Sequence, residues 1–316
     1  MEITGKKTIE PSELILLPIH IDAARNSTDD FNLFHDKHKW QQIKDNPFAG
    51  PIALGFQLEC LLENFVHQYR HSHKEYALME EMGLYYSNYQ YTFADVVKPG
   101  QRLKIDIRPS RHQYGDDILL GNRIALYADE HLAMRGYKKE SQYPLYKADL
   151  DIQENISMRD LKDRTFIDQG DVFVKLKYLN TGNAKNFMCG SMVEQSDYID
   201  ELENTVRFPE SFPTALISCA LLERARVEGH DFEAEPMVYT SHKISIDRRI
   251  HSKLASNNIL ALLVSAPVKQ NDNKGLGNTT GGQHLYYCQC LTQTNEILFH
   301  AQITMAPLEE ILRVKG

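Results

Sequence analysis

Cysteine is scarce in this 316-residue chain, which has five cysteines and no Cys-x-x-Cys spacing. An odd number at positions 60, 189, 219, 288 and 290 predicts neither a disulfide framework nor a zinc site. The sequence also has no apolar run near the roughly 18 residues that a membrane span needs, and its first residues do not form the apolar core of a signal peptide. We therefore expect a cytoplasmic protein that is neither secreted nor inserted in a membrane.

Basic residues are in the minority, with 35 Lys and Arg against 43 Asp and Glu and a formal net charge of -8. This balance argues against a general nucleic-acid binder, although a local basic patch is compatible with it. Hydrophobic residues make up 42% of the chain and charged residues 25%, as in ordinary globular proteins. The length leaves room for two domains of common size.

The stretch Asp30-Phe31-Asn32-Leu33-Phe34-His35 carries the strongest chemical signal. Acid/base chemistry on a carbonyl compound needs a proton carrier that titrates near neutrality, a carboxylate, and a donor for the developing enolate oxygen. His35 and Asp30 fit the first two roles, and the N–H groups at the start of the apolar helix that follows Gly50 fit the third. The alternative is ordinary turn and N-cap chemistry at Asp30 and Asn32, with a surface histidine after it.

These residues, together with the segment Gly50-Pro51-Ile52-Ala53-Leu54-Gly55-Phe56, resemble the signature of the MaoC-like hydratase/dehydratase family. Its pattern is Asp-x-Asn-Pro-x-His, followed by a segment like Pro-Ile-Ala-His-Gly-Met. The resemblance implies that Asp30 and His35 are the catalytic pair and that the Gly55 N–H polarises a thioester carbonyl. It also places Asn32 and Phe56 against the substrate.

The sequence departs from the pattern at two positions, with Leu33 in place of Pro and Leu54 in place of His. The first change relaxes a turn, and the second bears on substrate range more than on chemistry. A later stretch, 93–100, resembles the family's Phe-x-x-Pro-Val-x-x-Gly-Asp segment, with Gln101 in place of the Asp. The resemblance covers residues 14 to about 140 and is only architectural beyond 165.

The resemblance implies an α+β fold, a tandem (double) hot dog in which each half is a long central helix wrapped by an antiparallel sheet. The implied reaction is reversible hydration of a 2-enoyl-CoA or carrier-protein thioester, without metal or other cofactor. Arg102 and Arg108, on a predicted strand, are basic candidates for contacts with the anionic carrier, although such residues usually form only a solvated face. A homodimer is compatible with these features.

Residue patterns predict the elements of the first half. We expect a strand over 13–21, a short helix from Asp22, a long apolar-faced helix over 53–69, and strands within 83–111. Segments 118–127 and 131–139 read as a hairpin around Asp129 and Glu130. One helix followed by antiparallel strands is an α+β unit.

The second half repeats this layout, with a helix over 212–227 and strands over 237–247, 258–268 and 284–304. We expect an N-terminal domain over 1–145, a linker over 146–164 and a C-terminal domain over 165–316, with the two sheets joined edge to edge because exposed edges invite aggregation. Asp197 and Asp200 precede the second helix without a histidine and are predicted on a surface helix. We therefore expect one active site per chain, and the second half is expected to form part of the wall of the acyl pocket.

Other motifs favour simpler interpretations. His67 and His71 are four residues apart but lack the further ligands of a metal site, and the helix dipole explains histidines near a helix end. The glycine-rich stretch 275–282 is predicted to be a hairpin loop, because no helix follows it. Cys288 and Cys290 are predicted core residues. Two alternative functions remain open: a thioesterase using Glu59 or Glu63, and a non-catalytic binder of acyl thioesters.

Overall fold

Two units of similar layout follow one another in the computed structural model, which describes residues 14–113, 118–148, 150, 156–167, 170–269 and 282–315. The first contains β1 (Leu14–Ile15), α1 (Pro18–Thr28), the 3-10 helices η1 (Leu33–His35) and η2 (Lys39–Gln42), α2 (Gly55–Ser72), α3 (Glu75–Glu81), β2 (Tyr86–Phe93), β3 (Arg102–Ile107), β4 (Arg111–Gln113), β5 (Leu119–Ala128) and β6 (His131–Ser141). The second contains η3 (Met158–Asp160), β7 (Thr165–Ile167), β8 (Val172–Tyr178), α4 (Thr181–Gly190), β9 (Ile199–Asp200), β10 (Thr205–Val206), α5 (Ser211–Ala215), α6 (Ile217–Val227), β11 (Met237–Asp247), α7 (Arg248–His251), β12 (Ile259–Ser265), β13 (Val268–Lys269), β14 (His284–Thr292), β15 (Ile297–Pro307) and α8 (Leu308–Lys315).

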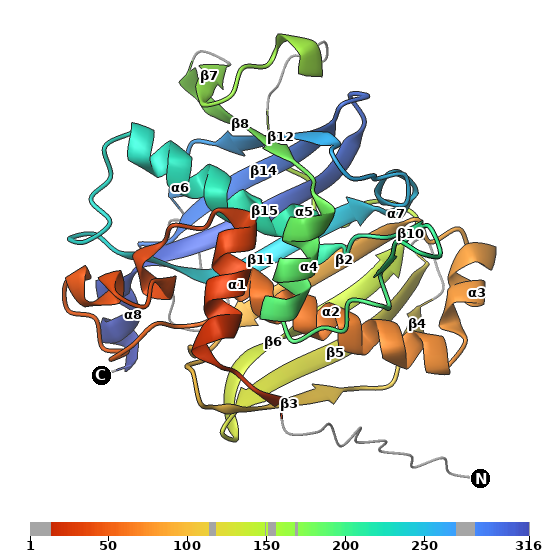
Figure 1. The fold of residues 1–316 in the computed structure, drawn as a ribbon, viewed down its shortest axis with the longest axis horizontal. Helices are drawn as coiled ribbons and strands as arrows, with labels where there is room; N and C mark the ends of the chain where they lie inside the picture. Colours follow the sequence, from red (N-terminus) through yellow and green to blue (C-terminus); the bar gives the residue numbers. More distant parts are fainter. Residues whose placement is uncertain are drawn as a thin grey trace.

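One antiparallel sheet runs through both units in the order β1-β3-β5-β6-β2-β11-β15-β14-β12-β8-β7 (Figure 1). The units meet where β2 pairs with β11, with Tyr91 opposite His242 and Tyr89 opposite Ile244. The predicted edge-to-edge junction is therefore confirmed. The domain boundaries at 145 and 165 stay a prediction.

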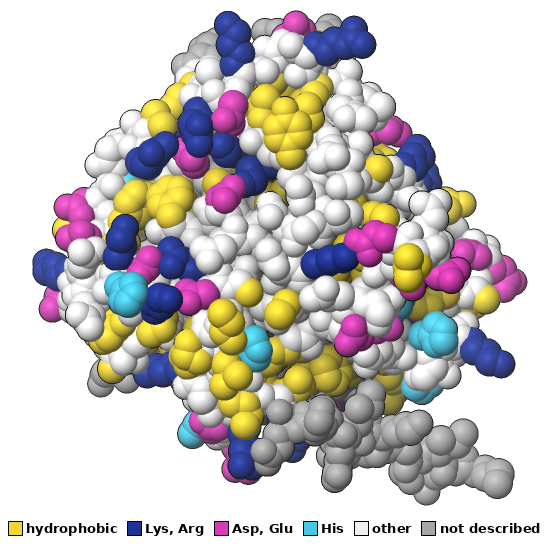
Figure 2. Space-filling view, viewed as in Figure 1, with side chains coloured by type: hydrophobic (Ala, Val, Ile, Leu, Met, Phe, Trp, Pro, Cys, Tyr) yellow, Lys and Arg dark blue, Asp and Glu magenta, His cyan; other side chains and the backbone are white. Residues whose placement is uncertain are grey.

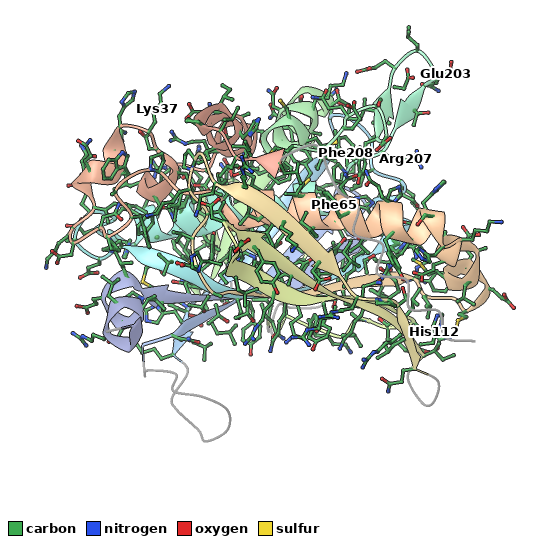
Figure 3. The ribbon with its side chains drawn as sticks, turned by 90° about the horizontal axis from the view of Figure 1, so that it is seen from below. Lys37, Phe65, His112, Glu203, Arg207 and Phe208 are labelled. Carbon is green, nitrogen blue, oxygen red and sulfur yellow. The ribbon has the colours of Figure 1, made fainter. Side chains whose placement is uncertain are left out.

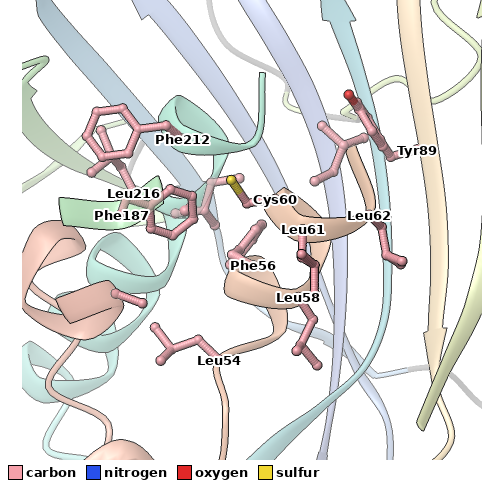
Figure 4. Packing of buried hydrophobic residues seen from close by; sticks show 14 of the residues in the cluster. Leu54, Phe56, Leu58, Cys60, Leu61, Leu62, Tyr89, Phe187, Phe212 and Leu216 are labelled. Carbon is pink, nitrogen blue, oxygen red and sulfur yellow. The ribbon is translucent and has the colours of Figure 1, made fainter. Parts of the chain in front are cut away.

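The long helices lie on one side of this sheet, with α2 stretched across it at the labelled Phe65 (Figure 3). The predicted helix over 53–69 is confirmed as α2, and all its residues from Gly55 to Asn64 are buried. Apolar side chains from α2, α4 and α5 meet around Phe56 and Cys60 (Figure 4). A helix buried on all sides must find partners for its polar side chains.

For the first half of α2, partners come from the second unit. The Gln57 amide donates to the Gly190 carbonyl at 2.5 Å, Glu59 bonds His242, and Glu63 accepts two backbone N–H groups. Each contact spans more than 130 residues of sequence. The central helix of the first unit is thus fixed by the second.

The strand predicted over 13–21 is wrong beyond Ile15, since α1 begins at Pro18 instead of Asp22. Proline suits the first position of a helix, because its fixed φ is helical and the N–H it lacks would have no partner there. Helix α1 then packs closely on α4: a Cβ on Gly190 would lie 2.6 Å from the Ala24 nitrogen. Only glycine permits this approach of the two helices.

The surface helix predicted around Asp197 and Asp200 is also wrong. Ile199–Asp200 forms β9 of a small hairpin, and the Asp200 carboxylate accepts the N–H groups of Leu202 and Glu203 in its turn. The hairpin tip at Glu203 points away from the sheet (Figure 3). Asp200 serves a turn, which its short acceptor side chain suits.

Other predictions of structure are confirmed. The hairpin β5–β6 turns at Asp129 and Glu130, both with positive φ, and Cys288 and Cys290 are buried. Of the glycine-rich stretch 275–282, all but Gly282 lies outside the described residues. Within the described ranges, no helix is both long and apolar enough to cross a bilayer.

Candidate active site

The motif from Asp30 to His35 forms a tight turn directly after α1. One oxygen of the Asp30 carboxylate accepts the Asn32 N–H at 2.8 Å, and the Asn32 side chain accepts the Phe34 N–H at 3.1 Å. Asp30 and His35 are 3% and 5% exposed. Turn chemistry is therefore present, but the histidine that follows it is buried instead of lying on the surface.

The His35 ring is held in one tautomer. Its Nδ1 lies 2.8 Å from the Ile52 carbonyl oxygen, which can only accept, so Nδ1 carries the proton and Nε2 keeps its lone pair in the neutral ring. Burial lowers the pKa of His35 below its usual value of 6.5, against the opposing effects of the Asp30 charge and the Ile52 carbonyl. His35 is accordingly a neutral base at pH 7.

Gly55 begins α2 three residues after Ile52, whose carbonyl holds His35. The Ile52 N–H donates to the Phe34 carbonyl at 2.9 Å, so the chain entering α2 is tied to the motif. The first N–H groups of a helix have no carbonyl partner within it and carry the positive end of its dipole. A Cβ on residue 55 would lie 2.8 Å from the Phe93 ring, so glycine keeps this helix start close to β2.

An apolar pocket opens beside the motif, between the two units. Its empty space, which includes open solvent, is about 510 Å³. Asn32 and Phe34 line it from the first unit. The second unit supplies most of the wall, including Leu221, Leu222, Met237, Tyr239, Tyr286 and Met305.

Tyr239 links this wall to the motif. Its hydroxyl bonds the Ser218 hydroxyl of α6 at 2.9 Å. Burial and then the negative charge of Asp30 raise its pKa well above the usual value, which places Tyr239 within electrostatic reach of the motif. Phe56, predicted to bind substrate, is buried with its ring centroid 6.0 Å from that of Tyr239 and does not line the pocket.

The structure places Asp30, Asn32 and His35 in one turn and ties His35 to Ile52, which precedes α2. Asn32 lines the pocket, whereas Asp30, His35 and Gly55 do not. Arg102 and Arg108 lie apart from this turn. Arg102 begins β3 and Arg108 directly follows its end. Three strands separate β3 from β11, and neither arginine lines the pocket. Arg108 is 61% exposed and lies 3.6 Å from Asp106. Their contact with a carrier stays a prediction. Across the face drawn in Figure 2, basic and acidic side chains are interspersed.

The start of the second central helix is occupied from within the protein. The Glu63 carboxylate accepts the N–H groups of Glu210 and Ser211 at 2.7 and 2.8 Å. Burial and the nearby Glu210 charge raise the pKa of Glu63 to about 7. The N–H groups at the start of α5 are therefore unavailable to a ligand in the second unit.

The sequence analysis missed His242 and Tyr239. His242 is completely buried, and its Nδ1 lies 2.7 Å from the Glu59 carboxylate. The alternation of His242 with Ile244 and Ile246 in β11 was the available signal, because it assigns all three to one face of the sheet. Within the described ranges, no group of three or more His, Cys, Asp or Glu is arranged to hold a metal ion.

Comparison with known proteins gives a structural match only: no protein-family profile and no curated protein matches the sequence. A MaoC-like dehydratase is 10% identical, with a TM-score of 0.53 and coverage of 93% of this chain and 95% of its own. A putative MaoC domain dehydratase from Chloroflexus aurantiacus is 9% identical, with a TM-score of 0.57 and coverage of 94% and 93%.

A conserved hypothetical protein from Mycobacterium tuberculosis, described as having a double hot dog fold, is 11% identical. Its TM-score is 0.56, and the match covers 95% of each chain. At such low identities the similarity shows the fold. The chain has the double hot dog fold of MaoC-like dehydratases, which confirms the expected fold class.

Proposed function

We propose that this protein reversibly adds water to the double bond of a 2-enoyl thioester, with Asp30 and His35 as its acid/base pair. The observation that carries the proposal is the buried, neutral His35, which lies beside Asp30 and is held by Ile52, three residues before α2 begins at Gly55. The resemblance of the motif and the double hot dog fold support the same reaction.

In the hydration direction, Asp30 and His35 hold the water between them. His35 Nε2 removes a proton as the water oxygen bonds to C3 of the enoyl group, and the electron pair of the double bond moves toward the thioester oxygen. The Gly55 N–H stabilises the resulting enolate oxygen. The proton then passes to C2, which leaves a 3-hydroxyacyl thioester and restores the pair.

The apolar pocket takes the acyl chain in this proposal, and the carrier is CoA or an acyl carrier protein. Most of the pocket wall belongs to the second unit. That unit has no counterpart of the Asp30–His35 pair in the region before its own helix. Its role is therefore to bind the chain, while the first unit performs the chemistry.

A spectrophotometric assay with crotonyl-CoA and longer 2-enoyl-CoAs tests this function, with free thiol measured in parallel. Loss of the conjugated enoyl absorbance without thiol release is the expected result. Thiol release would instead identify a thioesterase, and binding without either reaction would identify a non-catalytic binder. The chain length giving the highest kcat/KM then indicates how much of the pocket is filled.

The lowered pKa of His35 predicts the pH dependence of the reaction. We expect kcat/KM to hold steady from about pH 8 down to 6.5 and to fall only at lower pH, because the neutral ring is the base. The unfolded chain takes up this proton near 6.5 and the folded chain only at lower pH, so acidification through that window also lowers the free energy of unfolding. An acid limb centred above 6.5 would contradict the assignment of His35.

The occupied second helix start predicts one ligand per chain. Calorimetric titration with a non-reactive enoyl-thioester analogue should saturate near one equivalent. Because Asp200 serves a turn, changing both Asp197 and Asp200 to Asn should leave turnover within a few fold. Two equivalent ligands per chain, or lost turnover in the double variant, would show that the second unit carries chemistry.

A further inference from the structure

A buried glutamate–histidine pair lies beneath the helix start and has no part in the hydration steps above. His242 is on β11 of the second unit, and Glu59 is on α2, one turn after Gly55. The His242 Nδ1 and a Glu59 carboxylate oxygen are 2.7 Å apart, with both residues almost fully buried. Among the described residues, His242 Nε2 has no hydrogen-bond partner.

Aromatic rings enclose the rest of the imidazole. Phe56 stacks on it with centroids 4.5 Å apart, while Tyr239 and Phe93 meet it edge to face at 4.7 and 4.9 Å. The ring also lies against Gly55: a Cβ built on that glycine would be 3.5 Å from the His242 Cε1 atom. His242 therefore contacts both the residue that starts α2 and the tyrosine that lines the pocket.

Packing alone does not account for these residue types. A buried ionisable pair loses hydration that its mutual attraction only partly returns, and apolar residues of similar volume are often equally stable or more stable. An unpartnered buried nitrogen adds a further cost. A phenylalanine would suit an aromatic enclosure, yet the chain places a histidine there and a carboxylate to orient it.

We propose that His242, oriented by Glu59, is a positioning residue that holds the Gly55 end of α2 in register with the pocket wall, so that the Gly55 N–H meets the thioester carbonyl. The inference rests on the proposed role of Gly55. His242 acts through two contacts, Gly55 on one side and Tyr239 on the other. The hydrogen bond to Glu59 sets the rotation of the ring and thereby both contacts.

This arrangement predicts a defect specific to the carbonyl group. Two unreactive ligands measure the contribution of the carbonyl group to binding. The first is an acyl-CoA analogue with CH₂ in place of sulfur, which keeps the carbonyl. In the second, the carbonyl is also reduced to CH₂. The Kd of the reduced ligand divided by the Kd of the carbonyl ligand, both measured by calorimetry on the full chain, reports carbonyl recognition. A larger ratio means stronger recognition of the carbonyl. A purely structural role for His242 would change both Kd values together and leave the ratio unaltered.

We expect His242→Phe to reduce the ratio by about tenfold to a hundredfold, since small misplacements of positioning groups have effects of this size. Glu59→Gln keeps an acceptor for the Nδ1–H and should retain most of the ratio. His242→Asn, which can still donate to Glu59, serves if the Phe variant fails to fold, and its ratio should fall between the other two. Thermal unfolding checks the fold of each variant.

An unchanged ratio in a folded His242→Phe or His242→Asn protein overturns the inference, as does a wild-type protein that binds both ligands equally. The outcome is independent of turnover. If the wild type hydrates no enoyl thioester but loses carbonyl recognition on substitution of His242, the proposed reaction fails and the positioning role stands. If hydration is present, kcat/KM should fall as well, because the substrate carbonyl uses the same contact.

Discussion

Replacing His35 by alanine is expected to lower the hydration rate by about a hundredfold or more, because it removes the group that takes the proton from water. Asp30→Asn should have an effect of similar size, since the amide cannot accept a proton or keep the charge beside the imidazole. The backbone hydrogen bonds of the turn, from the His35 N–H to the Asn32 carbonyl and from the Ile52 N–H to the Phe34 carbonyl, do not involve these side chains, so the fold should survive. Steady-state kinetics with the best enoyl-CoA measures both effects.

His38→Ala is the matched control for this experiment. His38 lies in the same loop, three residues beyond His35, but its side chain is exposed. Its turnover should remain close to that of the wild type. Near-full activity in either His35→Ala or Asp30→Asn would refute the assigned mechanism, whereas an equal loss in His38→Ala would point to a general disturbance of the loop.

Glu140→Ala is expected to lower the free energy of unfolding by about 3 kcal/mol, because the buried Arg70 loses its close carboxylate partner and keeps only Glu75 at 3.8 Å, while Lys138 keeps Glu210. The Glu140 carboxylate is fully buried, forms an ion pair with Arg70, and lies 2.9 Å from the Lys138 ammonium. It also accepts the Ser87 hydroxyl at 2.9 Å. Burial alone would raise the pKa of Glu140, but Lys138 and Arg70 hold it below the usual value.

Urea unfolding monitored by circular dichroism measures this change. The control is Asp106→Ala. Arg108, the partner of Asp106, is mostly exposed and lies 3.6 Å away, so the free energy of unfolding should fall by no more than about 1 kcal/mol in this variant. A similar stability of the two variants would mean that Arg70 and Lys138 find other partners or reach water. Turnover per folded molecule should change little in Glu140→Ala, since this cluster lies away from the pocket lining.

Local patterns in the sequence were sufficient for the elements that depend on neighbours in the chain. The long helix α2, the hairpin β5–β6 and the turn at Asp30 and Asn32 follow from periodicity and turn chemistry. The apolar run containing Pro18 was ambiguous, because proline is compatible with both a strand end and the first turn of a helix. The strand predicted there is wrong beyond Ile15, and Pro18 begins a helix.

Contacts between the two units could not be predicted in this way. Glu59 meets His242 across 183 residues, and Glu63 meets Ser211 across 148. Both depend on how β2 aligns with β11, and a shift of one residue would turn His242 to the other face. A glutamate on a central helix therefore suggested a thioesterase, whereas the structure gives Glu63 a capping role in the second unit.

The junction between β2 and β11 also determines how the pocket is assembled. Because both walls belong to one polypeptide, each unit meets the other at an effective concentration on the order of millimolar, and the pocket cannot dissociate on dilution. In a symmetric dimer, every substitution would appear twice. In this chain a change in one unit has no copy in the other, so Glu63 of the first unit can occupy the start of α5 in the second.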